Sequence, residues 1–149
     1  MKRLILIFCL LFLASGCAPQ QALIKPTASG YPEGTFRNST VDTVRSILID
    51  GCSSKGLLVQ ESGGNQVVCG KTMAGGDAVL AQMIVGNSYS TTPERKIRLI
   101  IYQSGDDVKV TAYEWIESQM AFGQMRRQEL KSNNQKNDIQ QFLFSLGAY

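Results

Sequence analysis

The chain has 149 residues, of which 44% are hydrophobic and 18% are charged, with 15 basic residues, 12 acidic residues and no histidine. The lack of histidine excludes Ser-His-Asp and Cys-His catalysis, and it excludes zinc or haem sites that need a histidine ligand. The net charge is only slightly positive, and the sequence has no block of basic residues and no motif that reads nucleic acid, so nucleic-acid binding is not expected.

The first 16 residues have the pattern of a signal peptide. A basic start, Lys2 and Arg3, precedes residues 4–14, which carry no charge. As a helix this apolar run spans about 16 Å, at ~1.5 Å per residue, and it is too short to cross a ~30 Å hydrocarbon core. Residues 1–16 are therefore expected to be removed as a leader.

The leader ends in the residues Leu13, Ala14, Ser15, Gly16 and Cys17. This segment resembles the lipobox of bacterial lipoproteins, in which small residues precede a cysteine that is acylated and becomes the new N-terminus. The lipobox prefers Leu three residues before the cysteine, where this chain has Ala14. The resemblance implies a lipid anchor on Cys17, with chains such as palmitate, and Ala18 in place of aspartate implies the outer membrane. The alternative is an ordinary secretory signal with a chance cysteine.

Residues 17–36 contain three prolines and no apolar period, so we interpret them as a flexible tether. A coil of this length reaches about 25 Å, at ~5–6 Å times the square root of its length, which would let the domain sit away from the bilayer. Residues 37–149 are expected to form a single α+β domain with its own core.

A first helix is predicted after an N-cap at Ser39 or Thr40, because the following apolar residues have helical spacing. These residues are Val41, Val44, Ile47 and Leu48, and Cys52 extends their face by one turn. Residues 57–59 and 67–69 then predict two strands that flank the turn-rich residues 62–65. The sequence therefore predicts a helix followed by a β-hairpin.

A second hairpin is predicted from residues 96–103 and 108–116. If Gln103 pairs with Val108, Arg98 lies opposite Tyr113 and Lys96 lies opposite Trp115, whereas a slip of one residue would exchange the faces. This register places four apolar or aromatic side chains on the outer face: Ile100, Tyr102, Tyr113 and Trp115. We interpret them as a candidate partner surface, and ordinary strand surface is the alternative.

Residues 78–85 are apolar on nearly every side, which predicts a helix buried against the core. The alternative is an exposed docking element. Residues 117–130 are compatible with a longer strand or with another helix. A last helix is predicted over residues 137–146 from the helical spacing of four apolar residues, Ile139, Phe142, Leu143 and Leu146.

This order of elements predicts an α+β two-layer sandwich, with an antiparallel sheet of about four strands packed by the N-terminal and C-terminal helices. The order resembles the helix-grip domains of the lipoprotein subunit of the outer-membrane β-barrel assembly machine. The similarity is carried by residues 40–48, 57–72, 96–116 and 139–146. It is a similarity of element order without a diagnostic motif, so it does not assign a function.

Cys52 and Cys69 remain in the mature domain after Cys9 is lost with the leader and Cys17 takes up lipid. We predict a disulfide between them, because an exported protein meets an oxidising compartment and both side chains are expected in the same layer. The alternative is a pair of reduced cysteines that pack as small apolar side chains.

No catalytic, metal or cofactor site is expected. Asp106 and Asp107 lie in a predicted turn, and Glu114 and Glu117 flank Trp115 without a pattern that places them about a cleft. The glycine pairs at residues 63–64 and 75–76 are not followed by the lysine and the serine or threonine of a phosphate-binding loop. The enzyme class is therefore the least favoured.

We predict a non-enzymatic, lipid-anchored envelope protein that acts as an interaction domain or scaffold for another envelope protein. The alternative is a lipoprotein that binds a small apolar ligand or lipid between helix and sheet. A pocket lined by residues 79–85 would favour this alternative. The oligomeric state and the side of the membrane that the domain faces are left open by the sequence.

Overall fold

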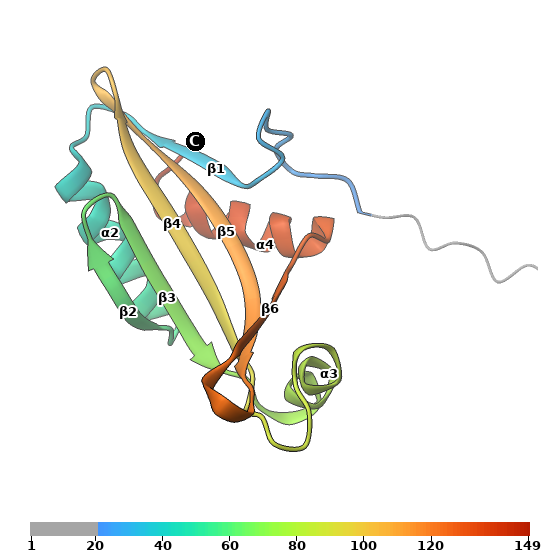
Figure 1. Ribbon diagram of the computed structural model, residues 1–149. Coiled ribbons are helices and arrows are strands. Elements are labelled where there is room, and N and C mark those ends of the chain that lie inside the picture. Colours follow the sequence, from blue (N-terminus) through green and yellow to red (C-terminus); the bar gives the residue numbers. More distant parts are fainter. Residues whose placement is uncertain (1–20) are drawn as a thin grey trace, which may run out of the picture.

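The computed structural model describes residues 21–149 as a curved antiparallel sheet with helices on one face (Figure 1). The elements in chain order are β1 (Glu33–Phe36), α2 (Val41–Ser54), β2 (Leu58–Gly63), β3 (Gln66–Thr72), α3 (Gly75–Val85), β4 (Glu94–Ser104), β5 (Asp107–Gln119), the short 3-10 turn η1 (Ala121–Gly123), β6 (Met125–Glu129) and α4 (Asn133–Ser145). The predicted lipobox and Cys17 lie outside the described residues.

The sheet has six strands in the order β1-β5-β4-β3-β2, and β6 also pairs with β5. The α+β class is as predicted, but about four strands was an undercount. Both additional strands pair with β5, which is 13 residues long: β1 pairs with its first half and β6 with its second half. β1 lies in the segment predicted as tether, and β6 lies in the segment that the sequence left ambiguous.

The main core lies between the inner face of the sheet and helices α2 and α4. Val44 and Leu48 of α2 and Leu143 of α4 are fully buried against β4 and β5, where Leu99 and Val110 are also fully buried. Both helices begin at a side-chain cap: Thr40 accepts from the Thr43 backbone, and Ser132 forms a capping box with Gln135. The capping box starts α4 four residues before the predicted position.

The β4–β5 hairpin has the predicted register. Gln103 pairs with Val108, Arg98 with Tyr113 and Lys96 with Trp115. The turn contains Gly105, whose φ of 66° is in the left-handed region that glycine adopts without strain. This register turns Leu99 and Val110 inward and leaves the aromatic residues on the outer face.

The predicted tether of residues 17–36 is too long, and the domain begins earlier than residue 37. Residues 33–36 form β1, and the segment before it is bonded to α4. Asn137 accepts from the Ile24 N–H at 2.9 Å and donates to the Ala22 carbonyl at 2.8 Å. Asn133 donates to the Gln21 carbonyl at 2.7 Å. The sequence concealed these contacts because they join polar groups more than a hundred residues apart.

The prediction that residues 78–85 are buried was wrong for most of that helix. α3 packs against Ile116 of the sheet through only two buried residues, Ala81 and Val85. Its other apolar side chains are exposed: Val79, Leu80, Met83 and Ile84. The reason is position, because α3 lies beyond the end of the main core, where only its inner face meets the sheet (Figure 1). None of the helices within residues 21–149 is long and apolar enough to cross a membrane.

Candidate functional site

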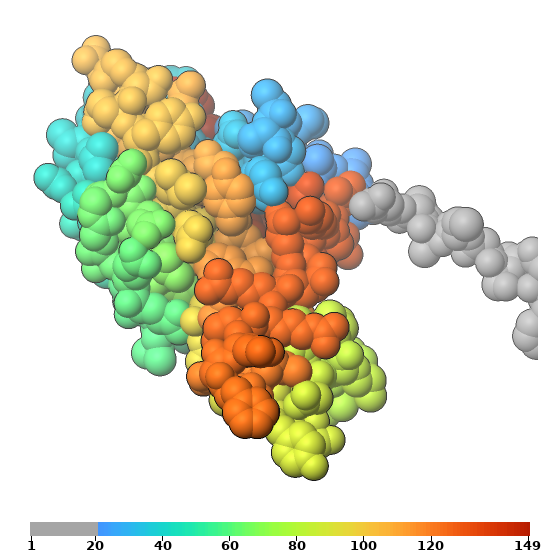
Figure 2. Space-filling view, viewed as in Figure 1, coloured from blue at the N-terminus to red at the C-terminus, as the bar shows by residue number. Residues whose placement is uncertain are grey.

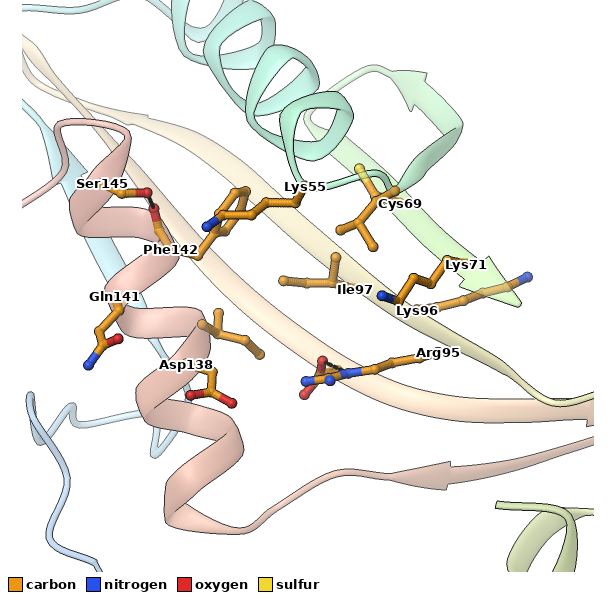
Figure 3. Close-up of a pocket in the computed structure, with 13 residues that line it drawn as sticks. Lys55, Cys69, Lys71, Arg95, Lys96, Ile97, Asp138, Gln141, Phe142 and Ser145 are labelled. Atoms are coloured by element: carbon orange, nitrogen blue, oxygen red, sulfur yellow. Dashed lines mark hydrogen bonds and ion pairs between the residues drawn. The ribbon is translucent and has the colours of Figure 1, made fainter. Parts of the chain in front are cut away.

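A groove of about 550 Å³ lies between α4 and the C-terminal end of α2, over the inner face of β3, β4 and β5 (Figure 3). Its apolar surface comes from Leu57 after α2, from Cys69 and Ile97 on the strands, and from Ile139 and Phe142 on α4. The charged and polar residues that complete the lining are Lys55, Lys71, Arg95, Lys96, Glu114, Asp138, Gln141 and Ser145. The groove therefore offers an apolar floor with charges around it.

An ion pair lies on the sheet side of this groove. The Arg95 Nε donates to Glu114 Oε1 at 2.5 Å, and Arg95 extends from β4 toward Asp138 of α4 (Figure 3). The Glu114 side chain is 6% exposed, whereas that of Arg95 is 38% exposed. Position 114 faces inward because it alternates with Tyr113 and Trp115 along β5. The strand period thus carries a carboxylate into the inner layer.

The second oxygen of this carboxylate, Glu114 Oε2, is buried and has no hydrogen-bond partner. Burial raises the pKa of Glu114 above its ordinary value of 4.5, and the Arg95 guanidinium only partly opposes that shift. A buried polar atom without a partner is costly, and such atoms in native structures require an explanation. A ligand that donates a hydrogen bond to Oε2 would satisfy it.

The rim of the groove is predominantly basic. Lys55 and Lys71 are exposed, and within residues 21–149 neither forms an ion pair. Lys96 also lines the groove, but its Nζ is held by Glu94 and Glu117. The groove therefore has free cationic groups at its edge. On its sheet side it has the Glu114 carboxylate, of which only one oxygen has a hydrogen-bond partner. These groups complement a ligand that carries both a hydrogen-bond donor and negative charge.

The Cys52–Cys69 disulfide is confirmed, with a Cα–Cα distance of 6.3 Å. Both cysteines are fully buried, and the bond joins the last turn of α2 to β3. Because Cys69 also lines the groove, this bond fixes the position of one wall relative to the sheet.

The predicted partner surface on the outer face is partly covered by the chain itself. The Tyr31 ring packs on Tyr113, with 4.3 Å between ring centroids. Trp115 lies near two guanidinium groups, those of Arg98 at 5.5 Å and Arg127 at 5.7 Å. Ile100 is half-buried and Tyr102 is 43% exposed. The four predicted residues thus share one face, but Tyr113 and Trp115 are already in contact with the chain's own side chains.

Glu117 holds the outer face together beside Trp115. Its side chain is 4% exposed and bonds Lys96 at 2.7 Å, Arg127 at 2.6 Å and the Trp115 indole N–H at 2.7 Å. Burial alone would raise the pKa of Glu117, but hydrogen bonds from Lys96 and Trp115 outweigh burial and keep the pKa below 4.5. This arrangement is a saturated structural network, which leaves the inner groove as the better candidate site.

Sequence reasoning missed the groove because its residues come from three strands, from α4 and from the segment that ends α2. Arg95 and Glu114 are 19 positions apart, and Asp138 is on the last helix. The available signal was strand parity, which turns Glu114 toward the core in the predicted register. Within residues 21–149 no cluster of three or more cysteine and acidic side chains is placed to hold a metal ion.

No protein-family model, curated protein or solved structure matches the chain. The resemblance to helix-grip domains stays a prediction that element order alone supports.

Proposed function

We propose that this chain is a lipid-anchored, non-enzymatic binding protein of the bacterial envelope, which takes a segment of a partner envelope protein into the groove between α2 and α4. The observation that carries the proposal is Glu114, a residue of the groove lining whose Oε2 is a buried acceptor without a partner. A peptide N–H or a side-chain donor from the partner would satisfy this atom.

The lining of the groove supports a peptide segment as the ligand. Ile97 and Phe142 provide apolar contact area, and Lys55, Lys71 and Arg95 offer donors to carboxylates. Peptide segments present apolar side chains, backbone donors and charges close together, which is the mixture that this groove complements. An acidic, partly apolar segment is therefore the expected partner sequence.

A small apolar ligand or lipid is the second candidate. It is favoured by the volume of about 550 Å³, which is within the usual range for ligand pockets, and by the apolar contribution of Ile97, Ile139 and Phe142. A shallower depression lies on the outside of α3, lined by Val79 and Met83 together with polar loop residues. This depression is open to solvent. It does not lie between a helix and the sheet, which is where the alternative function would place an apolar ligand.

Site-specific photo-crosslinking in envelope membranes tests the proposed groove. A photo-reactive residue at Gln141, on the exposed groove edge of α4, should form an adduct with one partner protein, whereas the same residue at Tyr102 on the outer face should not. Lys71→Glu should weaken the Gln141 adduct, because it reverses a cation at the rim. Lys109→Glu is the matched control, an exposed strand lysine on the opposite face. Adducts from Tyr102 alone, or equal loss in both lysine variants, would contradict the groove.

A further inference from the structure

The end of the molecule that carries α3 exposes an unusual amount of apolar surface. We name as the apolar tip the exposed apolar side chains of α3, of the loop after it, of η1 and of the start of β6: Val79, Leu80, Met83, Ile84, Tyr89, Phe122 and Met125. Met83 is 77% exposed and Phe122 is fully exposed. Figure 2 shows α3 and the η1 turn at one end of the domain, and α3 contacts β6. Large apolar side chains exposed together at one end of a domain are typical of a surface that contacts a protein or a membrane.

The backbone at Phe122 is strained in a way that points to a role for this side chain. Phe122 has a φ of 66°, in the left-handed region that side chains other than glycine rarely adopt. The next residue, Gly123, also has a positive φ and adopts it without strain. A second glycine would suit the turn better, yet the chain holds an aromatic ring there in solvent. Strain of this kind is found where the strained residue has a function.

The charge pattern around the apolar tip fits a bilayer surface. Residues 78–93 and 118–124 carry no charge; Asp77, Glu94 and Glu117 bound these stretches, and Arg126 and Arg127 follow after Met125. Both arginines are exposed in β6, which adjoins the tip. Arg127 is paired with Glu117 at 2.6 Å, whereas Arg126 forms no ion pair within residues 21–149 and is the cation that can meet a headgroup. Apolar and aromatic side chains with basic neighbours are the pattern of surfaces that enter the headgroup region of membranes with anionic lipid.

The N-terminal segment brings the predicted lipid close to this end of the domain. Gln21 is bonded to Asn133 at the start of α4, beside which the chain leaves the domain (Figure 1). Only four residue steps separate Gln21 from Cys17, a span of at most ~14 Å. Leu130, three residues before Asn133, packs in the same cluster as Ala81 and Val85 of α3. The acylated cysteine and the apolar tip can therefore reach one bilayer surface.

We propose that the apolar tip inserts into the headgroup region of the bilayer that holds the Cys17 lipid. The domain then has two membrane contacts, so its orientation is fixed and the groove between α2 and α4 stays in water beside the membrane. This inference rests on the lipid anchor of the proposed function.

The first test uses the lipidated protein in vesicles of phosphatidylethanolamine and phosphatidylglycerol. A fluorophore is attached to a cysteine introduced as Met83→Cys or Phe122→Cys, and Leu58→Cys is the control, since Leu58 is 72% exposed on the β2 edge away from the tip. Aqueous iodide should quench the dye at 83 and 122 severalfold less than the dye at 58. Equal quenching at all three positions would overturn the proposal. The proposal would also be overturned if the protein were a dimer in detergent micelles and its dyes at 83 and 122 were protected from iodide there as strongly as in vesicles. A second copy of the chain would then cover the tip.

The second test separates the tip from the anchor. The mature chain with Cys17→Ser should bind the same vesicles weakly, and Phe122→Gly should reduce this binding about tenfold, as expected for the loss of one buried aromatic side chain. Phe122→Gly should leave the thermal midpoint unchanged or raised, because glycine adopts the positive φ. If Phe122→Gly leaves vesicle binding unchanged, the insertion of the apolar tip into the bilayer is refuted. If Cys17 takes up no lipid, the proposed lipid anchor is refuted. The second test is still valid in that case, because it uses a chain without lipid.

Discussion

Reducing the Cys52–Cys69 disulfide should lower the free energy of unfolding by about 3 kcal/mol. The bond closes a loop with a sequence separation of 17, and the chain-entropy model assigns about 3 kcal/mol to a loop of that size. Reduction removes the cross-link without deleting side-chain heavy atoms, so it leaves no cavity at these two fully buried positions. Urea titration of the domain with and without reductant measures this loss of stability, and the thermal midpoint should fall by roughly 10 °C.

The variant Cys52→Ala/Cys69→Ala is the control for the reductant. It should be less stable than the reduced wild type, since it leaves a cavity between α2 and β3, and reductant should not change its midpoint. If reductant leaves the wild-type free energy of unfolding unchanged while thiol titration shows complete reduction, the assigned role of the disulfide is refuted.

Two further predictions concern buried polar side chains. Glu117 has a pKa below its ordinary 4.5, so its charge stabilises the fold at neutral pH, and this contribution is lost as the pH falls below that value. Glu117→Gln should therefore lower the free energy of unfolding at about pH 7 and make it less dependent on pH below 4.5. Asp106→Asn in the exposed turn is the control and should leave the free energy of unfolding at about pH 7 unchanged. An unchanged pH dependence in Glu117→Gln would contradict the network. Asn137→Ala should cost about 1–3 kcal/mol and remove the hydrogen-exchange protection of Ile24, whose N–H it binds; retained protection at Ile24 would show that other contacts hold this segment.

The parts of the fold that follow from local pattern were predictable. The apolar spacing of α2 and the hairpin register were readable because side chains alternate at fixed periods, and the register followed from pairing Gln103 with Val108. The disulfide was predictable for the same reason, because the helical and strand periods place Cys52 and Cys69 in the same layer. β1 and β6 were not readable, because four- and five-residue strands with polar sequences owe their structure to the long free edge of β5.

The groove and the apolar tip depend on tertiary placement. The groove exists because α2 and α4 stand apart over the sheet, which no local pattern encodes. A helix as rich in apolar residues as α3 is ordinarily buried on several sides, so the sequence indicated burial, whereas only Ala81 and Val85 are buried against the sheet. The exposed remainder of α3 became visible only once its position beyond the main core was known.

The central claim, that this is a lipid-anchored envelope protein, is tested most directly at Cys17. Cells that express the wild type or Cys17→Ser are grown with a clickable palmitate analogue, and the purified chains are compared for label and for membrane fractionation. We expect label and membrane retention in the wild type, with label lost and the chain markedly released from membranes in Cys17→Ser. Equal label on both chains, or an unlabelled wild type, would contradict it.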